Sequence, residues 1–261
     1  MVTARTPLIA GNWKMNKNHM EAIAFVQKLA WALKDGKHSY SDAEVAVFPP
    51  FTDLRSVQNL VDADSLDIVY GAQDISQHDS GAFTGEISGE FIKSLGSKYA
   101  LVGHSERRQY HGEDDVICAA KVAAALRHNL VPMLCVGETE AELEEFGASA
   151  VPVRQLRAAL ADVKSDADVV IAYEPVWAIG TGKVATDEQA EQVCSALRAS
   201  LKETHGDDFA GRTRILYGGS VKAASIAGLM RQPNVDGALV GGASLDVKEF
   251  STIARFKQHV I

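Results

Sequence analysis

The residues best suited to chemistry in this sequence are polar side chains that stand near the ends of short apolar runs. They are Asn12, Lys14, Gln73, His104, Glu106, Glu138 and Glu174, followed by the glycine pairs Gly218–Gly219 and Gly241–Gly242. A carboxylate can act as a general base, and a histidine can donate or shuttle a proton. Peptide N–H groups of glycine turns can bind an anion. The set therefore offers a base, a proton donor and two anion-binding turns.

Eight apolar, β-branched runs must position these residues. They occupy residues 7–13, 44–48, 67–73, 99–103, 130–137, 168–173, 214–219 and 236–242. Most are apolar throughout, as expected of strands buried on both faces of a parallel sheet. The starts of the first and last runs are 229 residues and seven intervals apart, about 33 residues per interval, the size of a βα repeat. We therefore expect an α/β fold, a (β/α)8 barrel forming a single domain over residues 1–261, with its site at the carboxyl ends of the strands.

Helical patterns fill the segments between these runs. After the first run, spacings of three and four residues put one set of apolar residues on a common face: Ala22, Val26, Leu29 and Leu33. After the fourth run, the same spacing predicts a buried face made of Val116, Ala119, Ala123 and Leu126. Thr186, with Gln189 three residues later, is typical of a capping box and predicts that a helix begins there.

The composition excludes several classes of protein. With 46% hydrophobic residues, 23% charged residues and a formal charge of −8, the chain is acidic and has no basic block. A nucleic-acid or anionic-membrane partner would need a cationic patch, so we expect neither. Cys118, Cys135 and Cys194 form no CxxC pair, which favours free thiols in a reducing cytoplasm. No apolar run approaches the ~20 residues of a membrane helix, and residues 1–6 do not resemble a signal peptide.

Several cofactor and nucleophile motifs are present only in part. GTGKVA at 180–185 fits GxGxxA, but six residues separate it from the preceding run, whereas a dinucleotide fingerprint opens directly from a strand. GHSER at 103–107 and GGSVK at 218–222 lack the second glycine of a nucleophile elbow. His104 and Glu106 match the start of a zinc-deaminase motif, but no PCxxC follows. We therefore expect no cofactor and no metal.

Six segments together carry a specific family resemblance. They are AGNWKMN at 10–16, YGAQDIS at 70–76, GHSERR at 103–108, AYEPVWAIGTG at 172–182, YGGSV at 217–221 and GALVGGASL at 237–245. In this order they resemble the triosephosphate isomerase family over essentially the whole chain. The resemblance implies a TIM barrel. It also implies an aldose–ketose isomerase that interconverts dihydroxyacetone phosphate and D-glyceraldehyde 3-phosphate through an enediolate, with neither cofactor nor metal.

The resemblance assigns roles to four catalytic candidates. Glu174 would take the proton from substrate carbon, and Pro175 beside it would stiffen a hinge. His104, expected to be neutral at pH 7, would donate to the substrate oxygens and shuttle the proton between them. Lys14 would supply positive charge to the substrate dianion and to the developing oxyanion. Glu106 would belong to the site and hold Lys14, although spacing alone fits a structural salt bridge equally well.

Glycine turns, rather than arginine, are expected to bind the phosphate. Asn12 can donate an amide hydrogen bond beside Lys14. The phosphate itself would meet peptide N–H groups at four positions, namely Gly180, Ser220, Gly241 and Gly242. Gly180 lies within 175–185, a segment with two glycines between stiffer flanks, which is typical of a lid.

The segment 73–89, about 17 residues long, exceeds most connections and predicts either a mobile loop or an interface. The resemblance implies the interface. It indicates a homodimer in which Thr84 lies near Asn12 of the partner subunit and the partner's Lys14. The apolar residues of the segment suit such docking: Ile75, Phe83 and Ile87.

Two other functions fit a barrel with anion-binding turns. A phosphate-binding barrel with aldol or lyase chemistry would need a Schiff-base lysine in the middle of a strand, and Lys98 and Lys164 instead precede strands. A barrel kept only for binding or structure would be indicated by the loss of Glu174, His104 or Lys14, and all three are present.

Overall fold

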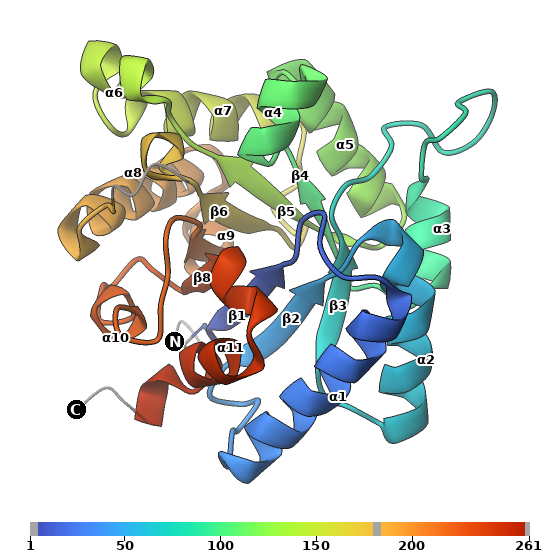
Figure 1. Ribbon diagram of the computed structural model, residues 1–261. Coiled ribbons are helices and arrows are strands. Elements are labelled where there is room, and N and C mark those ends of the chain that lie inside the picture. The colour runs from blue at the N-terminus through green and yellow to red at the C-terminus, as the bar shows by residue number, and fades with distance from the viewer. Residues whose placement is uncertain (1–4, 180–183, 259–261) are drawn as a thin grey trace.

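The chain forms a closed barrel of eight parallel strands surrounded by helices (Figure 1). The structure is a computed structural model that describes residues 5–179 and 184–258. The strands are β1 (Leu8–Asn12), β2 (Glu44–Phe48), β3 (Val69–Ala72), β4 (Tyr99–Val102), β5 (Val131–Val136), β6 (Val170–Tyr173), β7 (Arg214–Tyr217) and β8 (Gly237–Val240). Neighbours in the chain are neighbours in the barrel, and Ala10 of β1 opposite Leu239 of β8 closes it. The eight strands and the (β/α)8 barrel expected from the apolar runs are confirmed.

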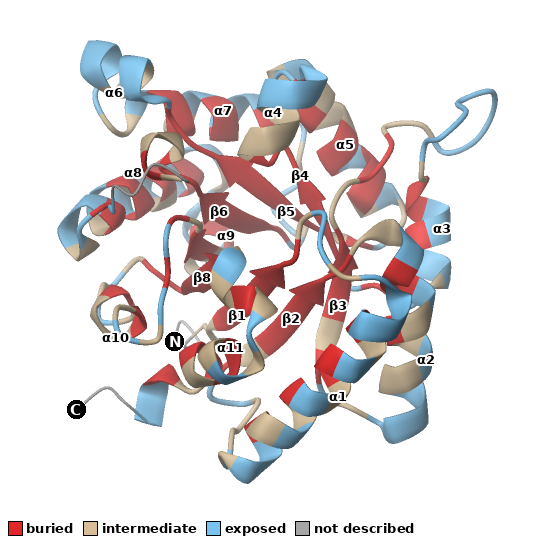
Figure 2. Ribbon diagram, in the orientation of Figure 1, coloured by how far each residue is buried: buried red, intermediate tan, exposed pale blue. Residues whose placement is uncertain are grey.

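Both faces of every strand are buried, which explains why the runs lack polar alternation (Figure 2). One apolar cluster fills the barrel interior and consists of Leu8, Ala10, Ala46, Phe48, Tyr99, Leu101, Met133, Cys135, Val170, Ala172, Leu216 and Leu239. A larger cluster lies between the strands and the surrounding helices, and includes Ile9, Val45, Val47 and Ile171 from the alternate strand positions. The barrel is therefore a packed core and not a pore, and it holds its strand ends rigidly.

Helices cover the outside of the barrel. The α-helices are α1 (His19–Asp35), α2 (Leu54–Asp64), α3 (Gly89–Ser94), α4 (Ser105–His111), α5 (Asp115–Arg127), α6 (Glu140–Phe146), α7 (Ala150–Leu160), α8 (Asp187–His205), α9 (Asp207–Arg212), α10 (Ile226–Leu229) and α11 (Val247–Ala254). Short 3-10 helices are η1 (Phe51–Asp53), η2 (Val176–Ala178), η3 (Gly242–Leu245) and η4 (Phe256–Gln258).

The sequence patterns for the start of α8 and for the buried face of α1 are confirmed. Thr186 and Gln189 form the capping box expected at the start of α8, with the Thr186 side chain accepting from the Gln189 N–H. The buried residues of α1 are the four expected ones together with Phe25. The capping box satisfies N–H groups that a helix start leaves without partners.

The buried face predicted for α5 is wrong. Val116 is 77% exposed, and the face that packs on the barrel consists of Cys118, Lys121, Val122, Ala124 and Ala125. Alanine occurs on every side of this helix, so apolar spacing does not distinguish its faces. The helix orientation depends instead on a buried ion pair, in which the Lys121 ammonium lies 2.6 Å from Asp74 and 2.5 Å from Glu113.

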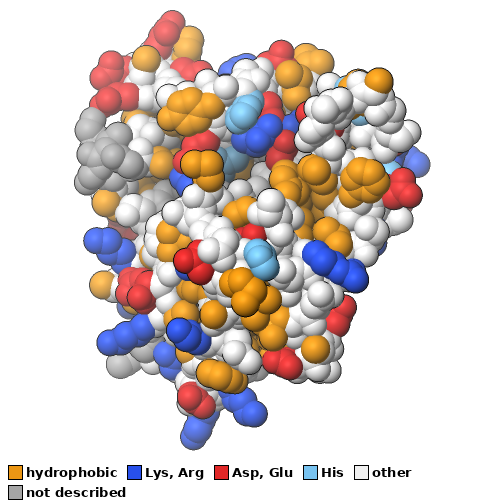
Figure 3. All heavy atoms as spheres, turned by 45° about the vertical axis from the view of Figure 1, so that its right-hand side comes forward, with side chains coloured by type: hydrophobic (Ala, Val, Ile, Leu, Met, Phe, Trp, Pro, Cys, Tyr) orange, Lys and Arg blue, Asp and Glu red, His pale blue; other side chains and the backbone are white. Residues whose placement is uncertain are grey.

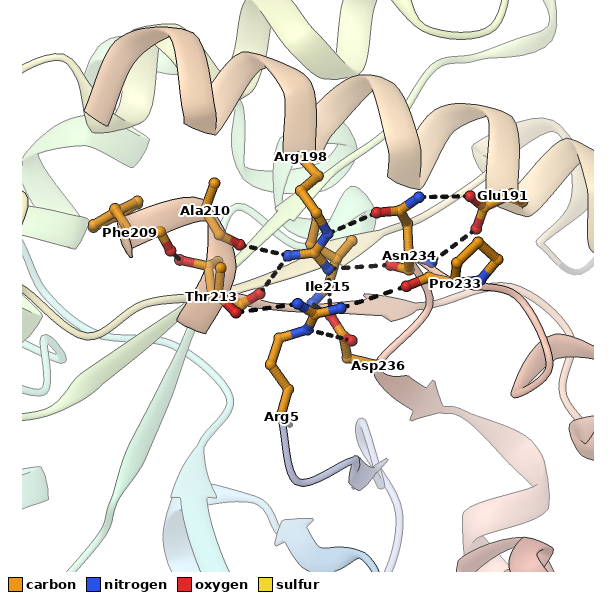
Figure 4. Close-up of polar contacts among 11 residues, drawn as sticks. Arg5, Glu191, Arg198, Phe209, Ala210, Thr213, Ile215, Pro233, Asn234 and Asp236 are labelled. Atoms are coloured by element: carbon orange, nitrogen blue, oxygen red, sulfur yellow. Dashed lines mark hydrogen bonds and ion pairs between the residues drawn. The ribbon is translucent and has the colours of Figure 1, made fainter. Parts of the chain in front are cut away.

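A polar cluster joins the start of the chain to α8, β7 and β8 at the amino-terminal end of the strands (Figure 4). The Asp236 carboxylate lies 2.6 Å from Arg5 Nε and also pairs with Arg198 of α8. Its Oδ2 accepts from the Ile215 N–H at 2.9 Å. One buried carboxylate thus connects the chain start, α8, β7 and β8 at the end of the barrel opposite the candidate site.

Candidate active site

A cavity of about 660 Å³ opens at the carboxyl ends of the strands. It is lined by eight of the nine residues assigned to catalysis or substrate binding, namely Asn12, Lys14, His104, Glu106, Glu174, Ser220, Gly241 and Gly242. The exception, Gly180, lies outside the described residues. Residues from five of the eight strand ends therefore meet at one cavity, as parallel strands in a closed barrel require.

Glu174 follows β6 directly and is 2% exposed. Its backbone N–H donates to the Val136 carbonyl at 2.8 Å, which extends the strand pairing and fixes the start of the side chain. Oε2 accepts from the Ser105 N–H at 2.9 Å, and Oε1 lies 2.9 Å from His104 Nε2. Burial acts to raise the pKa of Glu174, but His104, the Ser105 N–H and Lys14 together hold that pKa below its ordinary value. Glu174 is therefore an ionised carboxylate within the cavity.

His104 is the N-cap residue of α4, and its ring is nearly buried. Nδ1 accepts from the Glu106 N–H at 3.2 Å, so this nitrogen carries no proton. Nε2 must then carry the proton that it donates to Glu174, and a neutral ring satisfies both contacts. Burial lowers the pKa of His104, but Glu174 together with Glu106 raises it, and the net effect is a pKa above its ordinary value, so acidification protonates this ring earlier than an ordinary histidine.

Lys14 lies in the loop after β1 with a left-handed backbone, φ = 53°. Two hydrogen bonds hold this conformation: its N–H donates to Asn12 Oδ1 at 3.0 Å, and its carbonyl accepts from Gln73 Nε2 at 2.8 Å. The ammonium lies 2.6 Å from Glu106 Oε1. The structure thus brings Lys14 and Glu106 together. It also identifies Gln73, known from the sequence only as a strand-end residue, as a support for the Lys14 backbone.

The glycines after β7 and β8 differ in what surrounds them. A Cβ on Gly218 would lie 3.0 Å from Glu174 Cγ, and one on Gly219 would lie 2.2 Å from the Tyr217 hydroxyl, so both glycines are needed for close packing. A Cβ on Gly241 would meet only Lys14 Cε, at 3.8 Å, and one on Gly242 would meet nothing within 4 Å. Gly241 and Gly242 therefore border open space, where peptide N–H groups can approach an anion.

Glu138 and two donors around it, Tyr173 and Trp177, hold the segment after β6, and no sequence pattern predicts this arrangement. The Glu138 carboxylate is fully buried. Its Oε1 accepts from the Tyr173 hydroxyl at 2.9 Å and from Trp177 Nε1 at 2.7 Å. Burial raises the pKa of Glu138, and the two donors oppose that rise. A strand-end acid expected near the cavity instead fixes η2, the 3-10 helix that follows Glu174 and Pro175.

The arrangement can move a proton on a small anionic molecule. An ionised carboxylate, a neutral imidazole with a donor nitrogen, and an ammonium group all line one cavity. Such a set can remove a proton from carbon and stabilise the charge that develops on a neighbouring oxygen. Within the described residues, no cluster of three or more His, Cys, Asp and Glu side chains has the arrangement of a metal site.

Comparison with known proteins identifies one family over nearly the whole chain. The model of the family described as triosephosphate isomerase matches residues 7–257. A triosephosphate isomerase of Leifsonia xyli is 63% identical over 257 residues, which cover 98% of this chain and 99% of that protein. Triosephosphate isomerases of Streptomyces avermitilis and Mycobacterium avium are 58% and 56% identical, covering 98% and 96% of this chain and 99% and 96% of those proteins. The chain therefore belongs to the triosephosphate isomerase family.

Proposed function

We propose that this protein interconverts dihydroxyacetone phosphate and D-glyceraldehyde 3-phosphate by proton transfer through an enediolate. Family membership supports the reaction. The observation that carries it in the structure is the position of an ionised, almost fully buried carboxylate, Glu174, beside a donor imidazole, His104, in one cavity. A carbon acid next to a carbonyl needs such a base together with donors at the oxygen.

The reaction follows from the chemistry of these three side chains. Glu174 removes a proton from the carbon next to the carbonyl, and the electron pair moves onto the carbonyl oxygen to give the enediolate. His104 donates to that oxygen and transfers a proton between the two oxygens. Lys14 stabilises the negative charge. Glu174 then returns its proton to the other carbon, so no atom is gained or lost overall.

The remaining site residues position Lys14 or bind the phosphate. Asn12 supports Lys14 and lies at the end of β1, and Glu106 holds the Lys14 ammonium in place through a 2.6 Å ion pair. Ser220, Gly241 and Gly242 would bind the phosphate through N–H groups at the cavity wall. Gly180 is assigned to the phosphate from the family resemblance alone.

Aldol or lyase chemistry is the weaker alternative. It requires a neutral lysine amine that attacks a carbonyl. The lysines of the described cavity lining are Lys14 and Lys222. The Lys14 ammonium is engaged by Glu106 at 2.6 Å, and neither lysine lies within a barrel strand.

We infer that the protein acts as a homodimer through the segment 73–89. The connection between β3 and α3 projects from the barrel (Figure 1), and its tip, residues 81–86, is exposed. Hydrophobic side chains appear around this side of the surface (Figure 3), and Phe83, Tyr110 and Met15 are among the exposed large apolar residues. Ile75, expected from the sequence to dock in a partner, is instead fully buried in its own chain. The docking surface is therefore the tip and not the whole segment.

A cytoplasmic location is also proposed. Cys118, Cys135 and Cys194 are free and buried, and burial raises the pKa of each thiol. Inert thiols suit a reducing compartment. Among the described residues, no helix is both long enough and apolar enough to cross a membrane.

A coupled assay that starts from D-glyceraldehyde 3-phosphate tests the activity. We expect the product to be dihydroxyacetone phosphate, formed without added metal or nucleotide. Purified protein that binds the triose phosphate without converting it would contradict the proposal.

A further inference from the structure

The charged side chains that line the cavity carry a net negative charge unless Lys222 is counted, and with Lys222 they balance. Lys14 is the positive group nearest the chemistry, but its ammonium is paired with Glu106 at 2.6 Å. Glu174 adds a second carboxylate, and the His104 ring that contacts it is neutral in this arrangement. One cation against two carboxylates would repel a phosphate dianion, in a chain whose formal charge is already −8.

Among the described residues, Lys222 is the second lysine that lines this cavity, after Lys14. It follows β7, two residues after Ser220 and on the wall that also carries Gly218 and Gly219. Its ammonium forms no ion pair within 4.0 Å among the described residues, unlike that of Lys14. Its charge therefore remains available to an incoming anion.

The backbone of Lys222 is fixed although its side chain is exposed. Its N–H donates to Ser225 Oγ at 3.1 Å, and its carbonyl accepts from the N–H groups of Ser225 and Ile226, both at 3.0 Å. The next residue, Ala223, donates to the Glu249 carboxylate at 2.7 Å. This carboxylate holds the turn in place and reduces the field of Lys222 without forming an ion pair with it. The turn thus holds the backbone of Lys222 at the cavity wall, with an exposed side chain.

We propose that Lys222 recruits the phosphate dianion to the cavity and selects phosphorylated substrates, while the proton-transfer step proceeds without it. This inference rests on the proposed function, because the phosphate is the dianion in question. A unit charge near the entrance of a cleft raises the capture rate of an oppositely charged ligand, and dissolved salt screens that effect. Lys222 therefore acts on capture, whereas Lys14 acts on the reacting oxygen.

The test compares Lys222→Ala with Lys164→Ala, since both changes remove one positive charge. Lys164 is an exposed residue before β6 that does not line this cavity. At low ionic strength, we expect Lys222→Ala to lower kcat/KM for D-glyceraldehyde 3-phosphate by about three- to tenfold, with kcat within about twofold of the parent. Lys222→Arg should recover most of the loss, and Lys164→Ala should behave as the parent.

Salt dependence and an uncharged substrate complete the experiment. The deficit of Lys222→Ala should shrink as the ionic strength rises to roughly 0.3 M, because the screening length falls below about 8 Å. D-Glyceraldehyde, which lacks the phosphate, should be turned over equally by Lys222→Ala and the parent. Inorganic phosphate should inhibit Lys222→Ala more weakly than the parent.

The outcomes separate this inference from the proposed function. A parent enzyme that does not isomerise the triose phosphate would overturn the function itself. An active parent whose Lys222→Ala variant matches Lys164→Ala at every ionic strength would overturn only the role of Lys222. A deficit that salt leaves unchanged, or one equally large with D-glyceraldehyde, would also overturn it, because a local structural effect would then explain the loss.

Discussion

The Nε2 of His104 lies 2.9 Å from Oε1 of Glu174, so the proposed proton donor and the proposed base share a hydrogen bond in the free protein. This contact satisfies both side chains while the cavity is open to solvent. Glu174 must release it to approach a substrate carbon, and the freed Nε2–H then becomes available to a substrate oxygen. In the proposed reaction, substrate binding would thus exchange one hydrogen bond for two interactions that proton transfer needs.

Replacement of Glu174 by Gln should leave the fold intact and remove most of the activity. The amide fills the same volume and can still accept from Ser105, but it cannot take a proton from carbon. Loss of a general base lowers kcat by about 10²- to 10⁴-fold. The coupled assay measures the loss, with circular dichroism as the check on folding. Glu145→Gln, at an exposed position of α6, is the matched control; near-parental turnover of Glu174→Gln would exclude Glu174 as the base.

The His104 ring should titrate at lower pH once Glu174 is neutralised. Glu174 raises the pKa of His104 against the effect of burial, so Glu174→Gln leaves burial to lower that pKa. Nuclear magnetic resonance of the labelled ring, followed from pH 8 to pH 4, gives both values. At pH 7 we expect the signature of a neutral ring protonated on Nε2 in the substrate-bound parent. A ring pKa unchanged by Glu174→Gln would mean that the 2.9 Å contact does not exist in solution.

Removal of the Asp236 carboxylate should destabilise the barrel without touching the active site. Asp236→Ala would leave the partly buried Arg198 without its carboxylate partner and would also remove the acceptor of the Ile215 N–H. Breaking a buried pair from one side costs about 3–5 kcal/mol in the free energy of unfolding. Urea denaturation measures this change. Asp207→Ala, which breaks an exposed pair with Lys202, should change stability very little, and equal losses in the two variants would contradict the buried role.

Shortening the tip of the 73–89 segment should produce monomers with poor activity. Removal of residues 80–85 takes out Phe83 but keeps the contact between Ser76 N and Ile87 O that closes the base of the segment. Analytical ultracentrifugation should show the parent as a dimer and the variant at half its mass. A parent that sediments as a fully active monomer at assay concentration would refute the proposed dimer.

The sequence predicts the barrel well because parallel strands buried on both faces leave a strong local signal. All eight apolar runs became strands, within a few residues at each end. The face of α5 was predicted wrongly because alanine surrounds that helix, and the residue that fixes its orientation is a lysine. A buried Lys121 can be understood only once two carboxylates are seen beside it, those of Asp74, 47 residues away, and of Glu113, which precedes the helix.

Some site residues could be predicted from the sequence because they closely follow a strand. Position after a strand is enough to bring Glu174, His104 and Lys14 to one cavity. It does not distinguish Glu138 from Glu174, since both are buried acids at strand ends. Their different surroundings, a tyrosine and a tryptophan in one case and a histidine in the other, arise from side-chain packing that spacing does not encode.

The left-handed backbone of Lys14 places two opposing demands on this residue, one from thermal stability and one from catalytic activity. A residue with a Cβ pays roughly 1 kcal/mol or more for this conformation, whereas glycine adopts it freely. A selection for heat resistance alone would therefore favour Lys14→Gly, and the same step would delete the ammonium group of the cavity. Engineering for higher thermostability should therefore begin at the opposite end of the barrel. There, substitutions that strengthen the polar cluster around Asp236 leave the catalytic residues unchanged.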